Sequence, residues 1–236
     1  MIGRVRYSVH RGKMEVKIKT IGLLTIADTV LYESRKLPVW LVRRRVKNME
    51  RLLRQHGVRR LIIDEAFPYS DCLVNWSLVD ALPFYRSIAD LLALAQLRCK
   101  GILPNSAVVA VSAPRISPEL RSAAERLCQL VKGIAIDVPE EGERYAAWLH
   151  RQFGLPIRAA GDADVTLAFA PVANAKGDLI LLHQECLSLN GLRVTAPELD
   201  LPEGYDARLL AALWERGSLE RKSLHIEGRK PLDKSI

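Results

Sequence analysis

Apolar and charged residues alternate in the first part of the chain. Residues 14–19 follow a period of two, which is typical of a strand with one buried face. Residues 5–9 and 22–27 could form strands that pair with it. The pattern predicts a small β appendage at residues 1–37.

A helical pattern begins at Pro38, because the apolar positions then recur every three or four residues. The predicted buried stripe consists of Val42, Val46, Met49 and Leu53. Gly57 follows at the position after a helix end, where a positive φ favours glycine. Residues 59–64 then form a short apolar run without alternation, which is typical of a strand buried on both faces.

Strands and helices alternate from here to about residue 169. We expect further buried strands at residues 108–111, 133–137 and 164–169, and a short strand at 157–160. Helices are predicted from Pro83 to near Cys99, from Pro118 to about Val131, and from about Pro139 to Phe153. This rhythm predicts an α/β fold with a mainly parallel sheet covered on both faces. The segments near residues 61, 108 and 134 should lie side by side in that sheet and point the same way.

The pattern changes after residue 170. A strand is predicted at residues 178–182, and the Asn-Gly pair at 190–191 predicts a hairpin within 187–194. A helix should begin near Asp206 and end at Gly217. The polar tail, residues 228–236, is expected to be frayed.

One strand–helix–strand segment carries a familiar arrangement. Its first turn reads Ser112-Ala113-Pro114-Arg115-Ile116-Ser117, and its second strand ends at Asp137. The segment 107–137 resembles the first βαβ unit of the Rossmann dinucleotide-binding family, and the resemblance covers residues 105–171. It implies a Rossmann-like three-layer sandwich, which we place at residues 38–227.

The resemblance also implies a ligand site. Asp137 stands where the family has its ribose-binding carboxylate, while Ser112, Arg115 and Ser117 would contact an anion at the positive start of the helix. All three glycines of the family's GxGxxG turn are absent, so we expect no dinucleotide cofactor. In the alternative interpretation, Asp137 only ends a strand and Ser117 only caps a helix.

Charge is distributed unevenly along the chain. The net charge of +8 divides into +12 for residues 1–60 and −4 for residues 61–236. Four cations share a face of the first predicted helix, away from its apolar stripe: Arg44, Lys47, Arg51 and Arg54. Such a face suits a nucleic acid or an acidic protein, and the alternative is a solvated helix surface.

The remaining candidates for chemistry are sparse. Asp64 and Glu65 follow a buried strand, but adjacent residues on extended chain point in opposite directions and make a poor acid–base pair. His183, Glu185 and Cys186 form one short cluster without partners elsewhere, so we expect no metal site. The sequence has neither a GxSxG nor a P-loop motif, so a conventional hydrolase or NTPase is disfavoured and catalysis stays undecided.

The expected cellular compartment is inferred from features that the sequence lacks. The four cysteines form no CxxC pair, the first residues have no secretory pattern, and no apolar run has the roughly 20 residues of a membrane helix. We therefore expect reduced thiols, a cytoplasmic location and no contact with a membrane.

Three functions are compatible with these features. The first is a degenerate Rossmann-like module that binds a partner macromolecule. The second is an enzyme or sensor for a nucleotide-like or phosphorylated small ligand, and the third is a basic nucleic-acid-binding protein.

Overall fold

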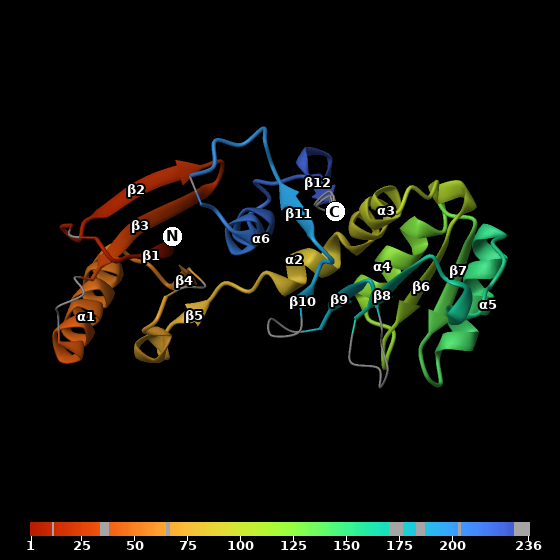
Figure 1. Cartoon of the computed structure of the whole chain (residues 1–236), viewed down its shortest axis with the longest axis horizontal. Helices are drawn as coiled ribbons and strands as arrows, with labels where there is room; N and C mark the ends of the chain where they lie inside the picture. Colours follow the sequence, from red (N-terminus) through yellow and green to blue (C-terminus); the bar gives the residue numbers. More distant parts are fainter. Residues whose placement is uncertain are drawn as a thin grey trace, which may run out of the picture. The chain divides into compact units, whose positions relative to one another are not determined.

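The protein is mixed α/β in the computed structural model, with two mostly parallel five-stranded sheets and six α-helices among the residues described (Figure 1). The structure describes residues 1–10, 12–33, 38–64, 67–169, 177–182, 187–202 and 204–228. The chain forms two compact units, each made of two separate segments. Unit 1 is Met1–Asp80 with Pro197–Glu220, and unit 2 is Ala81–Ala196 with Arg221–Ile236.

The sheet of unit 1 has the strand order β2-β3-β1-β4-β5. Its strands are β1 (Ile2–Ser8), β2 (Val16–Ile21), β3 (Leu24–Tyr32), β4 (Arg60–Ile63) and β5 (Ser77–Leu78). Strand β1 is parallel to β3 on one side and to β4 on the other, while β2 is antiparallel to β3. The strands expected at the start of the chain exist, but they share a sheet with β4 and β5. The boundaries of the two compact units therefore differ from the predicted division between residues 37 and 38.

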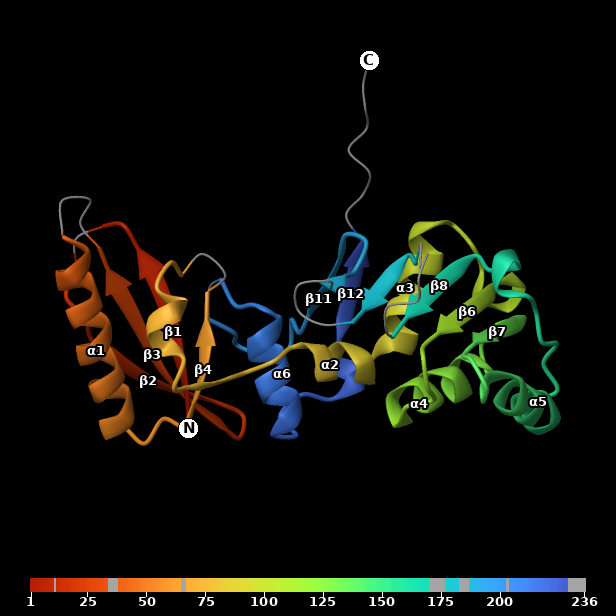
Figure 2. The same ribbon diagram turned by 90° about the horizontal axis from the view of Figure 1, so that it is seen from below.

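Two helices of unit 1 lie on either side of this sheet, α1 (Val39–Gln55) and α6 (Ala207–Glu215) (Figure 2). The four stripe residues of α1 are completely buried, as the period predicted, and pack with Val5 and Leu61. Gly57 ends the α1 turn with φ +75°. In α6, Arg208 donates a hydrogen bond to the Ile63 carbonyl, which ties the helix to β4.

The sheet of unit 2 has the order β10-β9-β8-β6-β7. Its strands are β6 (Val108–Ser112), β7 (Gly133–Asp137), β8 (Val165–Ala168), β9 (Leu179–Leu181) and β10 (Leu187–Ser188). Its helices are α2 (Leu82–Ser87), α3 (Ala89–Cys99), α4 (Pro118–Leu127) and α5 (Gly142–Phe153). Strand β6 is parallel to both β7 and β8, and α4, α5 and α3 contact β6, β7 and β8 respectively. A separate antiparallel pair, β11 (Leu192–Thr195) and β12 (His225–Gly228), lies against α3.

The expected position of the strand near residue 61 was wrong. Strand β4 belongs to the sheet of unit 1, whereas the strands near residues 108 and 134, β6 and β7, are neighbours in the other sheet. Strand β4 pairs with β1, where Gly3 is the register partner of Leu61. A Cβ atom on Gly3 would stand 2.7 Å from Leu61 Cδ2, so a larger residue at position 3 would force the Leu61 side chain to move.

The hairpin expected at residues 187–194 was also wrong. The turn itself forms, with φ of 49° at Asn190 and 79° at Gly191. The strands on either side of it separate, because β10 pairs with β9 and β11 pairs with β12. The predicted helix between Pro83 and Cys99 is similarly divided at Ile88, where φ is −114°, and residues 157–160 contribute only an isolated bridge at Ile157.

None of the helices described here is both long and apolar enough to cross a membrane. Cys72, Cys99 and Cys128 are free thiols, and Cys186 lies outside the described residues, as does the tail beyond Gly228.

Candidate functional site

The outward face of α1 combines cations with an aromatic ring. Burying the apolar stripe turns the opposite side of the helix to solvent, since successive residues are about 100° apart. The side chains on that side are all exposed: Trp40, Arg44, Lys47, Arg51 and Arg54. Trp40 is 62% exposed, and it was overlooked at the sequence level although it precedes Arg44 by four residues. We call these five residues the α1 basic face.

Several neighbouring charges around this face are already paired. The Arg54 guanidinium lies 4.4 Å from the centre of the Trp76 ring, and Trp76 Nε1 donates a 2.7 Å hydrogen bond to Glu50. Arg43 pairs with Asp71 at 3.4 Å, and Arg45 donates to the Tyr32 carbonyl at 3.0 Å. Glu50, the single acidic residue of α1, is therefore bound to Trp76 and does not neutralise the basic face. The Trp76 ring in turn holds the Arg54 guanidinium in place.

Three cations of the face are available for a ligand. Arg44, Lys47 and Arg51 have no side-chain partner within the part of the chain that the structure describes. Helix α1 contains six Lys or Arg residues and a single acid, Glu50. From Arg44 to Arg54 the helix rises about 15 Å, so the cations form a row rather than a point. Such a row attracts an extended polyanion.

The predicted anion site in unit 2 is assembled only in part. Ser112 and Asp137 are register partners at the carboxyl ends of β6 and β7. Ser112 is buried, with its hydroxyl 3.5 Å from the Leu167 carbonyl, whereas Asp137 is exposed. Arg115 is exposed in the following loop. The serine is therefore enclosed by the sheet while the two charged residues face solvent.

Ser117 caps helix α4, as one interpretation of the sequence predicted. Its hydroxyl oxygen accepts a 3.2 Å hydrogen bond from the Leu120 N–H. Hydrogen bonds from its own backbone N–H and from the Ser117 hydroxyl lower the pKa of Glu119, which stabilises a carboxylate at the start of α4. The positive end of the helix is thus already matched by an internal anion.

A depression of about 340 Å³ lies beside the start of α4. It is lined by Ile116, Ser117, Pro118, Arg121, Ser122 and Glu125. Of the four residues predicted to bind a ligand, Ser117 is the one that borders this depression.

Arg86 occupies the neighbouring part of the carboxyl edge. Its Nε donates to the Leu181 carbonyl at 3.0 Å, and its Nη2 donates to the carbonyls of Phe169 and Leu182 at 3.1 and 2.8 Å. The guanidinium therefore covers the ends of β8 and β9, next to the switch point where open α/β sheets bind ligands. No sequence signal identified Arg86, because its acceptors are more than 80 residues away along the chain.

The other candidates from the sequence give no site. Burial raises the pKa of the Asp64 carboxyl, an effect that the charge of Arg4 opposes, and Glu65 lies outside the described residues. His183, Glu185 and Cys186 also lie outside them. Within the described ranges, no group of three or more His, Cys, Asp or Glu side chains is placed to hold a metal ion.

The comparisons with known proteins give no relative from which a role could be transferred: the chain matches no family model and no curated protein.

Proposed function

We propose that the protein is a macromolecule-binding module that binds a nucleic acid with the α1 basic face. The observation that carries this proposal is the row of exposed Arg and Lys side chains opposite a completely buried stripe. Phosphate groups repeat along a nucleic acid strand, so a row of cations can contact several of them at once. Release of counterions from those phosphates supplies most of the binding free energy.

The exposed Trp40 favours a nucleic acid over an acidic protein. Its ring shares the face with Arg44 and Arg51, and a base can stack on an indole while cations contact the backbone. Carboxylates of an acidic protein would use the cations and have less need of the ring. We therefore expect single-stranded nucleic acid, whose bases are accessible for stacking, to bind more tightly than duplex.

Fluorescence anisotropy with labelled single-stranded and duplex oligonucleotides over a range of salt concentrations tests this proposal. Changing Arg44, Lys47 and Arg51 together to Gln should weaken binding and reduce the salt slope for single strands by about two. The matched control removes three exposed cations elsewhere in unit 1, with Lys17, Lys19 and Arg59 changed to Gln. Equal losses in both variants would show that binding follows net charge alone.

Trp40→Ala separates the two kinds of partner. It should cost about 1–3 kcal/mol of affinity for single strands if a base stacks on the ring. Binding of polyglutamate without binding of any oligonucleotide at low salt would overturn the nucleic acid assignment in favour of an acidic protein.

A Rossmann-like interpretation of unit 2 leads to the second candidate, a small-ligand function, and to its alternative, a degenerate unit that binds no small ligand. The parallel order β7-β6-β8, with α4 and α5 as crossover helices, supports that interpretation, as does the meeting of Ser112 with Asp137. We propose that the unit is a degenerate form, in which Glu119 takes the place of a ligand phosphate. Stabilisation by a nucleotide in a thermal-shift screen, lost in Arg115→Ala, would instead favour an enzyme or sensor.

A further inference from the structure

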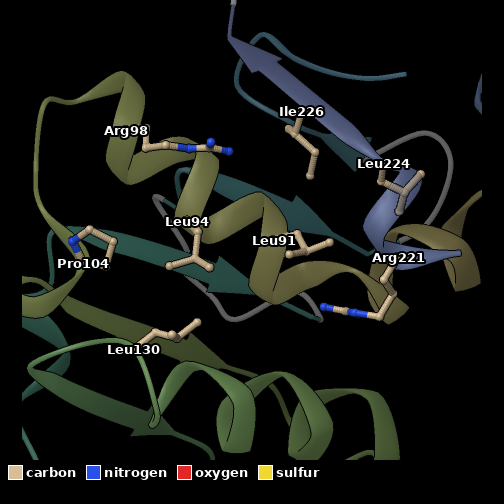
Figure 3. A pocket seen from close by; sticks show the side chains of 8 residues that line it. All are labelled: Leu91, Leu94, Arg98, Pro104, Leu130, Arg221, Leu224 and Ile226. Atoms are coloured by element: carbon tan, nitrogen blue, oxygen red, sulfur yellow. The ribbon is translucent and has the colours of Figure 1, made fainter. Parts of the chain in front are cut away.

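An apolar groove of about 380 Å³ lies within unit 2 over the outer side of α3, with Leu224 and Ile226 on one side and Pro104 and Leu130 on the other (Figure 3). Its lining is aliphatic apart from two arginines: Leu91, Leu94, Arg98, Pro104, Leu130, Arg221, Leu224 and Ile226. Leu91, Leu94 and Arg98 follow one another along the outer side of α3. The groove is separate from the α1 basic face, which belongs to unit 1.

Several apolar side chains around this groove stay exposed although the core of unit 2 is already packed. Helix α3 buries residues on most of its circumference, including Leu92, Ala93 and Leu97, and still presents leucines on the remaining side. Leu130 is 47% exposed, and Leu103, next to the lining Pro104, is 69% exposed. Contiguous exposed apolar surface of this kind marks a binding site.

Positive charge lies at both ends of the leucine row. Arg98 is exposed, and its guanidinium has no partner in the part of unit 2 that the structure describes. At the other end, Arg221 and Arg126 share one carboxylate, that of the buried Asp90, at 2.5 and 3.8 Å. One positive charge therefore stays uncompensated at each end. Leu91 and Arg98 are about 10 Å apart along the helix axis, from seven residues of rise.

We propose that this groove binds an amphipathic helix of a partner protein that carries acidic residues on either side of its apolar ones. Large apolar side chains spaced i, i+3, i+4 and i+7 would fill a groove of this length. Carboxylates in the flanking turns would meet Arg98 at one end and Arg221 with Arg126 at the other.

Two other occupants match the charges less well. A fatty acid has one carboxylate and would leave the cation at the far end without a partner. A second copy of this chain would bring one pair of arginine-rich ends against another, in a molecule with a net charge of +8.

The test uses two synthetic helical peptides of about 16 residues with leucine at i, i+3, i+4 and i+7. One has glutamate in the flanking turns, and the other has lysine at the same positions. Fluorescence anisotropy with the full chain should show binding of the glutamate peptide only. Leu94→Asp and Leu130→Asp should each weaken it about tenfold or more, with circular dichroism verifying that each variant folds.

A charge reversal makes the test specific. Arg98→Glu should weaken the glutamate peptide about tenfold and strengthen the lysine peptide, because the sign of one end is inverted. Arg144→Glu, at an exposed position on α5, makes the same change elsewhere in unit 2 and should alter neither.

Four results would overturn the proposal. The first is equal affinity for both peptides, and the second is no binding of the glutamate peptide at millimolar concentration. The third is binding of dodecanoate that Leu94→Asp abolishes and that the peptide does not displace. The fourth is a dimer in sedimentation that Leu94→Asp dissociates. The last two would assign the groove to an acyl chain or to a second copy.

Discussion

Single carboxylates of this protein often serve two partners, and Glu33 is the clearest case. It accepts a 2.6 Å hydrogen bond from the Tyr7 hydroxyl and 3.0 Å hydrogen bonds from the Tyr69 hydroxyl. The phenol of Tyr7 keeps its proton more firmly as a result, and its pKa rises from 10.0 to about 12. The proton shared by this pair connects the first strand of the chain to the end of β3.

The raised Tyr7 pKa predicts a loss of stability in alkali. Because the folded chain holds this proton more tightly than the unfolded chain, the contribution is complete below pH 10 and is lost as the pH rises through about 12. Urea unfolding between these pH values should show a shallower decline for Tyr7→Phe than for the wild type. Parallel curves for the two proteins would contradict the assigned hydrogen bond.

The Ser117 cap at the start of α4 gives a second prediction at the scale of a single residue. Replacing it with Ala removes the cap on the Leu120 N–H and a hydrogen bond to Glu119, and should cost about 1 kcal/mol of unfolding free energy. Ser122→Ala, within the same helix, is the control and should change stability by a few tenths of a kcal/mol at most. Chemical denaturation of the three proteins gives the comparison, and an unchanged Ser117→Ala midpoint would mean that the cap contributes nothing.

At the scale of the element, α1 has two faces with opposite roles. Leu53 is completely buried and Arg51 is exposed two residues away. Leu53→Ala should therefore cost about 2–5 kcal/mol of unfolding free energy, whereas Arg51→Ala should stay within about 0.5 kcal/mol and affect oligonucleotide affinity instead. Denaturation should show the larger loss of stability for Leu53→Ala, and anisotropy should show the larger loss of oligonucleotide affinity for Arg51→Ala. If one variant had the larger loss in both measurements, the division of α1 into two faces would be contradicted.

Elements with a repeating pattern were predictable, and their neighbours were not. The α1 stripe and its end at Gly57 follow from local periodicity and from the backbone freedom of glycine. The sequence located both, together with the four cations on the opposite side of the helix, but not Trp40 beside them. The partner of β4 is β1, which lies far earlier in the chain, and no local pattern signals this pairing. Arg86 caps carbonyls of β8 and β9 that lie far along the chain, so its role appears only once the sheet is assembled.

At the scale of the whole molecule, the chain passes between its two units three times. Unit 1 is complete only with Pro197–Glu220, and unit 2 is complete only with residues after Arg221. The predicted ranges, residues 1–37, 38–227 and 228–236, are each continuous along the sequence, whereas each compact unit combines two separate segments. Each unit therefore needs a segment from near the end of the chain to complete it.

A chain shortened to residues 1–220 tests this dependence. It retains every segment of unit 1 but lacks β12, so β11 loses its hydrogen-bonding partner and α3 loses the strand lying against it. Hydrogen exchange should show lost protection for the amides of Leu192–Thr195 and retained protection for those of β1 and β3. Uniform loss over both units would indicate that they unfold as one.

The interrupted course of unit 1 has a consequence during synthesis. Helix α6, whose Arg208 and Glu215 contact β4 and its Arg60, emerges from the ribosome more than a hundred residues after the strand it covers. At roughly 5–20 residues per second, the side of the sheet facing α6 stays uncovered for about 7–30 seconds. We expect the nascent first sheet to expose apolar surface during this period, and pausing of translation within unit 2 would lengthen the time in which it can aggregate.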